Sequence, residues 1–193
     1  HTATIADDGS VVVTTKITRT HKGGNTPYDW WNRVNSNYMR VYVPLGSQLL
    51  SAMGQTREFP PEPLDYNALG FKRDKDVVAE EQSIHIDDAT GTRVGEEFGK
   101  TVFGNWVYVS PGESVAVEYT YMLPFRVDPR QHTGGYSLLL QKQPGSRDID
   151  FTGSVQYPAY WQTVWQSDQD LLPWQESPGE KKVQQRLRNN LFY

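Results

Sequence analysis

The chain has 193 residues, a formal net charge of −4 at pH 7 and no cysteine. This length suits one domain of generous size or two small ones, and such a chain buries enough surface to fold without a metal or a disulfide. The lack of cysteine excludes thiol catalysis, disulfides and cysteine-ligated zinc. The acidic balance argues against a general nucleic-acid binder, which needs a basic face for phosphates.

No stretch of the sequence reaches the ~20 apolar residues of a membrane-spanning helix. No signal-like segment is present, and the chain begins at His1 rather than at a methionine. We therefore expect the chain to be a piece of a longer protein.

Most of the chain alternates apolar and polar residues with a period of two, which is typical of half-buried strands. Asp8-Gly9 separates two alternating runs within residues 2–20 and predicts a hairpin, with Val11 and Val13 on one face of its second strand. Ser110 to Glu113 predicts a tight turn between two further runs. Strands are also predicted in residues 38–44, 48–54, 82–87, 99–109, 114–125, 134–145 and 148–158.

Three segments interrupt this pattern. Residues 28–37 predict an aromatic-rich loop with at most one helical turn, and residues 55–82 a long connection. Residues 158–190 predict a tryptophan-rich, partly helical insertion or tail, because Val183 and Leu187 are four residues apart, as on one face of a short amphipathic helix. The alternative for that tail is a polar connection into a final strand at residues 191–193.

About eight short strands separated by turn residues predict an all-β fold. We expect an antiparallel, immunoglobulin-like β-sandwich with long loops and at most one or two short helices. Residues 1–193 are expected to form a single domain. In the strand at residues 82–87, Ile84 and Ile86 should point inward and His85 toward solvent.

Several phrases resemble one family of proteins. They are the hairpin at Asp8-Gly9, NYMRVYVPLGSQLLSAMG at residues 37–54, EEFGKTVFGNWVYVSPGESVAVEYTYMLP at residues 96–124 and YSLLLQKQPG at residues 136–145. Together they are similar to the C-terminal extracytoplasmic region of a family of membrane-anchored bacterial proteins of unknown function, found in Gram-positive and candidate-phylum bacteria. The resemblance covers most of residues 2–145. It implies an upstream membrane anchor, a larger preceding domain and a first strand that begins before His1.

The sequence predicts no cofactor. The four histidines, His1, His21, His85 and His132, do not lie within metal-ligand spacing of one another. Clustered carboxylates raise calcium as an alternative, with Asp148 and Asp150, or Asp87 and Asp88, as the first candidates. The competing explanation is that aspartate begins turns by bonding to its own backbone.

No catalytic motif is present, and we expect a protein that is not an enzyme. Glycoside cleavage needs two carboxylates that face one another. Glu80-Glu81 and Glu96-Glu97 are adjacent pairs, which point to opposite faces when they lie on a strand. The chain also lacks the G-x-S-x-G elbow of a serine nucleophile.

Five tryptophans, Trp30, Trp31, Trp161, Trp165 and Trp174, lie outside the predicted strands. Exposed indoles bind sugar rings and anchor protein interfaces, and Trp161 and Trp165 would lie together on a helix. The competing and favoured explanation is that the loops fold back and bury these rings in the open ends of the sandwich.

The sequence therefore predicts a non-catalytic structural or interaction module of a bacterial cell-surface protein, located outside the cytoplasm and anchored through a segment beyond this chain. The alternative is a carbohydrate-binding or adhesin domain that recognises cell-envelope glycans through the loop tryptophans. The expected partners are a protein or a cell-envelope polysaccharide, with no nucleic acid and no membrane span within the chain.

Overall fold

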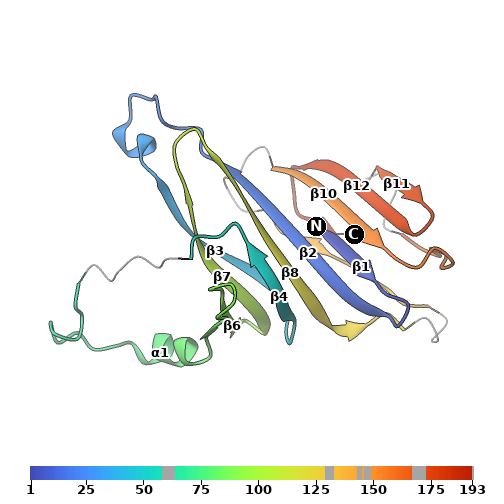
Figure 1. Cartoon of the computed structure of the whole chain (residues 1–193), viewed down its shortest axis with the longest axis horizontal. Helices are drawn as coiled ribbons and strands as arrows, with labels where there is room; N and C mark the ends of the chain where they lie inside the picture. Colours follow the sequence, from blue (N-terminus) through green and yellow to red (C-terminus); the bar gives the residue numbers. More distant parts are fainter. Residues whose placement is uncertain (58–63, 129–132, 143–144, 146–148, 167–172, 193) are drawn as a thin grey trace. The chain divides into compact units, whose positions relative to one another are not determined.

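The computed structural model describes residues 1–57, 64–128, 133–142, 145, 149–166 and 173–192. In this part the chain is an all-β sandwich with antiparallel sheets and one short α-helix, as the sequence predicts (Figure 1). The sequence predicts a single domain. In the structure the chain divides into two compact units. The first comprises His1–Thr15 and Phe125–Tyr193, and the second comprises Lys16–Pro124. Two long strands, β2 and β8, begin in one unit and end in the other.

The second unit contains strands from two sheets. In one sheet the end of β2 is followed by β8 and β4, and in the other the order is β3-β7-β6-β5. The bounds are β2 Ser10–Thr20, β8 Ser114–Arg126, β4 Gln48–Met53, β3 Asn35–Pro44, β7 Lys100–Val109, β6 Arg93–Glu97 and β5 His85–Ile86. Strand β6 is only five residues long and is not predicted from the sequence.

The predicted turn between β7 and β8 is confirmed, and in it the Glu113 backbone N–H donates to the carbonyl of Ser110 over 3.0 Å. The two strands belong to different sheets, so this turn carries the chain from one sheet to the other. On β8 every second residue from Val117 to Leu123 is buried, as alternation predicts. On β7 burial is continuous from Thr101 to Asn105. Thr101, Phe103 and Asn105 share one face of the strand, and Val102 and Gly104 share the other, so both faces are covered. On the face of Gly104 the ring of Tyr38 lies directly against the backbone.

Aromatic rings and one polar pair join the two sheets of this unit. Phe103 of β7 stacks on Tyr119 of β8, with ring centroids 6.2 Å apart, and meets the tilted ring of Tyr121 at 5.6 Å. The Tyr119 hydroxyl donates to Oδ1 of Asn105 over 2.9 Å, and both residues are completely buried. Burial raises the pKa of Tyr119 well above its ordinary value.

We predict that Tyr119→Phe lowers the free energy of unfolding by about 1–3 kcal/mol, because it leaves the buried Asn105 oxygen without its donor. Urea unfolding followed by circular dichroism measures this loss. Tyr42→Phe is the control, since Tyr42 donates to Glu97 at an exposed position, and its loss should be the smaller of the two. Equal effects of the two substitutions would contradict the prediction.

The first unit is built on the strand order β11-β12-β10-β1-β2, of which only the start of β2 belongs to this unit. The pair β1–β10 is parallel, whereas β1–β2, β10–β12 and β11–β12 are antiparallel. Two short strands, β9 and β13, form a separate pair. The bounds are β1 Thr2–Ile5, β10 Ile149–Gln156, β11 Trp174–Ser177, β12 Glu180–Leu187, β9 Leu139–Leu140 and β13 Leu191–Phe192.

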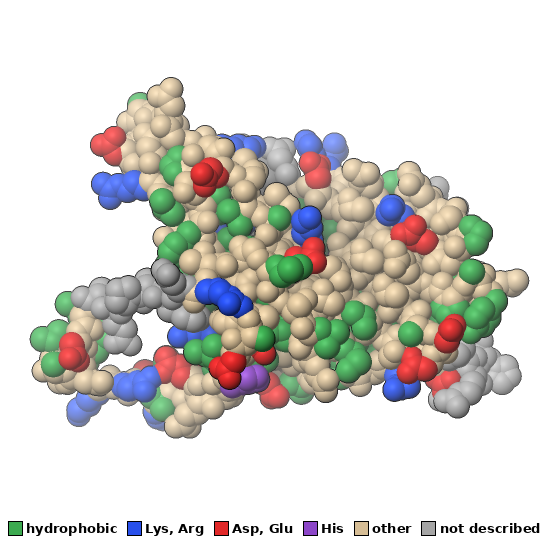
Figure 2. Space-filling model, viewed as in Figure 1, with side chains coloured by type: hydrophobic (Ala, Val, Ile, Leu, Met, Phe, Trp, Pro, Cys, Tyr) green, Lys and Arg blue, Asp and Glu red, His purple; other side chains and the backbone are tan. Residues whose placement is uncertain are grey.

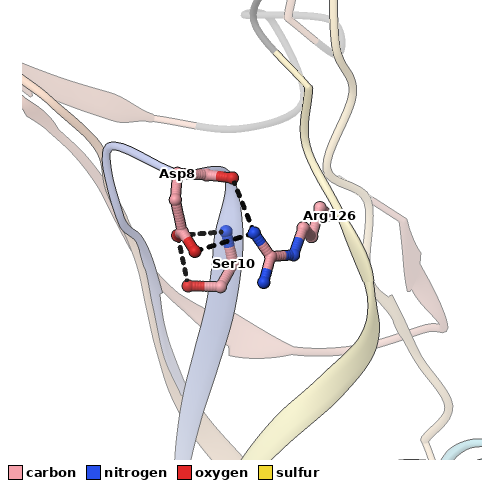
Figure 3. A network of polar contacts seen from close by, with 3 residues as sticks. All are labelled: Asp8, Ser10 and Arg126. Atoms are coloured by element: carbon pink, nitrogen blue, oxygen red, sulfur yellow. Dashed lines mark hydrogen bonds and ion pairs between the residues drawn. The ribbon is translucent and has the colours of Figure 1, made fainter.

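The predicted hairpin at Asp8-Gly9 is confirmed, and polar contacts hold it closed (Figure 3). Oδ1 of Asp8 accepts from the Ser10 backbone N–H (2.9 Å) and hydroxyl (2.6 Å), and Oδ2 pairs with Arg126 at 2.8 Å. These interactions lower the pKa of Asp8, the Ser10 hydroxyl most strongly. Gly9 has φ +80°, and a Cβ there would lie 2.2 Å from the carbonyl oxygen of Val127, so only glycine fits.

We predict that Asp8→Ala lowers the melting temperature at pH 7, and that the difference from the wild type disappears as the solution becomes acidic. A carboxylate whose pKa is lowered on folding stabilises the protein above its unfolded pKa of about 3.9, and this contribution is lost as the pH falls through the folded pKa. Thermal unfolding between pH 7 and pH 2 measures the effect. Ser10→Ala keeps the carboxylate and Arg126, so it should lower the melting temperature less than Asp8→Ala does. A difference in melting temperature between Asp8→Ala and the wild type that does not depend on pH would contradict the prediction.

The predicted helix at Val183 and Leu187 is wrong, because both residues lie on strand β12. A spacing of four is also a multiple of two, so it places both side chains on one face of a strand. Both are buried in an apolar cluster with Phe151, against which Trp174 and Ile149 pack. Within residues 158–190, the described part contains β11 and β12 and no helix. The alternative of a final strand is confirmed at Leu191–Phe192.

The predicted connection at residues 55–82 contains helix α1, Lys75–Gln82, which is capped by the Asp74 carboxylate. None of its residues is buried, so no apolar stripe was there to predict it. The segment before it exposes hydrophobic side chains (Figure 2), among them Leu69 and Phe71. Ile84 and Ile86 are 37% and 51% exposed, so the prediction that they point inward is wrong.

His85 is exposed, as predicted. Within the described residues, no helix combines the length and the apolar composition needed to cross a membrane.

Candidate functional site

A cavity of about 310 Å³ lies in the second unit, where the chain passes from β2 in one sheet to β3 in the other. The connecting loop carries η1, a short 3-10 helix at Asp29–Asn32 (Figure 1, the small blue helical turn between β2 and β3). Val109 at the end of β7 also lines the cavity. The side chains that give it chemical character are two indoles, one imidazole and three cations: Trp30, Trp31, His21, Arg19, Lys22 and Arg33.

The two tryptophans of this loop are exposed. Trp30 is 66% and Trp31 44% accessible, and their rings meet edge to face with centroids 5.2 Å apart. Tyr28 is also exposed, and its ring lies 6.0 Å from that of Trp30. The prediction that the loop tryptophans are buried in the ends of the sandwich is therefore wrong for Trp30 and Trp31.

Asn32 holds this loop in shape through four hydrogen bonds. Its Oδ1 accepts from the backbone N–H of Gly24 (2.9 Å) and from the backbone N–H (3.1 Å) and hydroxyl (3.0 Å) of Thr26. Its Nδ2 donates to the carbonyl of Thr26 over 2.8 Å. One side chain thus replaces the backbone ladder that the loop lacks, and it fixes the base of the turn that presents the tryptophans.

His21 and Gly23 fix the other side of the loop. The Gly23 N–H donates to Nδ1 of His21 over 2.9 Å, so the ring proton is on Nε2, which donates to the carbonyl of Arg33 over 3.0 Å. A Cβ on Gly23 would lie 2.0 Å from the carbonyl oxygen of Trp31 and 2.2 Å from its ring. Only glycine lets the backbone approach Trp31 this closely.

Arg19 links the two sheets at the cavity. Its Nη2 donates to Oδ1 of Asn35 over 3.2 Å, which joins the end of β2 to the start of β3. Its Nη1 is closed off from water, and no described residue provides an acceptor for it. Burying a guanidinium nitrogen in this way is costly, because the hydrogen bond that it made with water is not replaced.

The other tryptophans that the sequence singles out lie in the first unit and do not belong to this cavity. Trp161 is partly buried and Trp165 is 75% exposed, in a segment that is not helical, so the helix that would bring them together is absent. Trp174 begins β11 and packs on the apolar cluster of that unit. Burial of the loop tryptophans is thus wrong for Trp165 as well.

Of the four aspartates considered for calcium, Asp87 and Asp150 take part in other contacts and Asp148 lies outside the described residues. Oδ1 of Asp87 accepts from the backbone N–H and hydroxyl of Thr90, and these bonds, the hydroxyl's first, lower the pKa of Asp87. Asp150 pairs with Arg186 at 3.1 Å. Asp148 and His132 lie outside the described part. Within that part, no three histidine, aspartate or glutamate side chains gather as metal ligands would.

Glu96 and Glu97 lie on β6, as adjacent residues of a strand, and Glu97 binds Arg40 and Tyr42. Glu80 and Glu81 lie on helix α1 rather than on a strand, so the argument from opposite strand faces does not apply to them.

Sequence analysis missed Arg19, Gly23 and Asn32 as residues of a site. The pair Gly23-Gly24 was a usable signal, because consecutive glycines beside a double tryptophan indicate a close backbone approach. Arg19 was a usable signal as well, because it is in phase with Val11 and Val13 on the apolar face of an alternating strand, where a cation is unexpected.

Comparison of the chain with protein families, with curated proteins and with solved structures gives no match. The resemblance of residues 2–145 to a family of membrane-anchored bacterial proteins therefore stays a prediction.

We predict that Asn32→Ala accelerates hydrogen exchange at the amides of Gly24 and Thr26 by about fivefold, since each loses an acceptor worth about 1 kcal/mol. Amide exchange followed by NMR measures this. Asn32→Asp keeps the accepting oxygen and loses only the bond donated to Thr26, so the acceleration should be smaller. Unchanged protection in Asn32→Ala would show that this side chain does not hold the loop.

Proposed function

We propose that the chain is a non-catalytic interaction module that binds a saccharide of the bacterial cell envelope in the cavity beside Trp30 and Trp31. The observation that carries the proposal is the exposure of these two indoles on a loop that Asn32 and Gly23 hold in one conformation. Tryptophan is highly buried on average, so two adjacent exposed indoles on an ordered loop call for a binding role.

Physical chemistry favours a sugar as the ligand. The faces of a sugar ring present C–H groups that pack on an indole, while its hydroxyls remain free to bond with polar side chains. The cavity combines both requirements, since the indoles lie beside Arg19, Lys22 and Arg33. Its volume of about 310 Å³ is at the lower end of the range for ligand pockets, which suits one or two sugar residues at a time.

The cavity lining supports a binding role rather than catalysis. Among the described residues that line it there is no carboxylate, so the pair of acids that cleaves a glycosidic bond is missing from this part. The imidazole of His21 uses both nitrogens in bonds to backbone groups and is therefore not oriented as a base toward a ligand.

The setting of the module is part of the proposal. We place it outside the cytoplasm, as an immunoglobulin-like sandwich of a cell-surface protein that is anchored through a segment beyond this chain. Its support is the resemblance of the strand-and-turn phrases in residues 2–145. A protein partner docked on the same indoles is the second candidate, because exposed tryptophans also anchor protein interfaces.

We predict that cell-envelope polysaccharide shifts the intrinsic tryptophan fluorescence of the protein, and that Trp30→Ala or Trp31→Ala weakens the binding by about tenfold or more, as expected for the loss of an aromatic anchor. Titration with a panel of glycans measures the affinity, and circular dichroism verifies that each variant is folded.

Trp165→Ala is the matched control, because Trp165 is also exposed but lies in the first unit and is not among the residues that line the cavity. Its affinity should equal that of the wild type. If Trp165→Ala abolished binding and Trp30→Ala did not, the binding site would lie in the first unit, and the proposed site at Trp30 and Trp31 would be wrong. If no glycan of a broad panel bound, the saccharide would be excluded and a protein partner would take its place.

A further inference from the structure

The charge of the cavity differs from that of the chain as a whole. The chain has a net charge of −4, yet three cations, Arg19, Lys22 and Arg33, line this one cavity. Asp29 lies in η1 but is not among the lining residues, and none of the described lining residues is acidic. Positive side chains that converge on a concave surface raise the local concentration of anions and favour their binding.

Arg19 indicates where a negative group would bind. Its guanidinium already gives one nitrogen to Asn35, and the second, Nη1, lacks an acceptor among the described residues. A carboxylate or phosphate oxygen is the strongest acceptor available to a guanidinium, because the bond is assisted by charge on both partners. Since Nη1 is closed off from water, a small movement of the lining side chains must accompany binding.

The indoles and the cations line one cavity, and this combination suits a sugar residue that carries one charged substituent. Trp30 and Trp31 line the same cavity as Arg19, and both indoles are exposed. Lys22 and Arg33 are both exposed and can approach a charged group from the solvent side. Arg19 comes from β2 and Arg33 from the far end of the loop, so a bound anion would contact both ends of the connection.

We propose that the saccharide bound in this cavity is acidic, with its carboxylate or phosphate against the Arg19 guanidinium and its ring against the indoles. This inference rests on the proposed function and narrows it from saccharides in general to those with a negative charge. The two sources of that charge share the same chemistry at Arg19, so experiment must distinguish them.

The experiment titrates the protein by isothermal calorimetry with three ligands at low and at physiological salt. Oligogalacturonate supplies carboxylates, a glycerol-phosphate teichoic acid supplies phosphates, and cello-oligosaccharide of matched length supplies neither. We expect at least one acidic ligand to bind about tenfold or more tightly than the neutral one, with a preference that decreases as salt rises. The acidic ligand that binds identifies the source of the charge.

Two variants test the role of Arg19. Arg19→Gln should lower the affinity for the acidic ligand by about tenfold and leave the affinity for the neutral ligand unchanged. Lys16→Gln is the matched control, because Lys16 is an exposed cation on the same strand but outside the lining, and it should have no effect. Lys22→Gln, at an exposed position, provides a second test if Arg19→Gln does not fold.

The outcomes separate this inference from the proposed function. If the acidic and neutral ligands bound with equal affinity, and Trp30→Ala lost that affinity, the acidic preference would be overturned and the saccharide site would remain. An equal loss of affinity for the acidic ligand in Lys16→Gln and Arg19→Gln would mean that positive charge anywhere on the surface attracts the ligand. This result would also overturn the inference. Absence of binding to all three ligands and to the wider panel of glycans would overturn both.

Discussion

The packing of two sheets in the second unit, centred on Phe103, Tyr119 and Asn105, is the constraint on which the candidate site depends. These side chains join β7 to β8 and therefore hold β2, in the sheet of β8, at a fixed spacing from β3, in the sheet of β7. The loop that carries Trp30 and Trp31 must span that spacing. The cavity exists because a chain that changes sheets cannot fill the gap with paired backbone.

The loop meets this constraint with side chains rather than with regular structure. Asn32 supplies the hydrogen bonds that a ladder would otherwise provide, and Gly23 allows the backbone to pass against Trp31. Neither residue buries the indoles. A loop under selection for stability alone would place these large apolar rings inside, as the rings of Phe103 and Tyr119 are placed. The exposure of Trp30 and Trp31 is therefore the observation on which the proposed binding role rests.

The tight turns and the all-β class follow from local patterns in the sequence. Asp8-Gly9 and Ser110 to Glu113 are turns whose residue types determine the backbone, and alternation along β8 predicts its buried face. Prediction failed where one local pattern fits two structures. The spacing of Val183 and Leu187 suits a helix or a strand, and only pairing with β10 decides for the strand. Helix α1 was not predicted because it buries none of its residues, so its sequence shows no apolar pattern at all.

The candidate site could be predicted only in part. The double tryptophan and the glycine pair are visible in the sequence. The charge of the cavity depends on Arg19 and Arg33, which are fourteen positions apart and line one cavity only because β3 begins beside the end of β2. By itself the sequence determined where the chain turns, which residues alternate and that no thiol chemistry is available, because these properties depend on neighbours along the chain. The tertiary structure decided which strands pair, which tryptophans remain exposed and which cations converge, because these properties depend on contacts between residues that are distant in sequence.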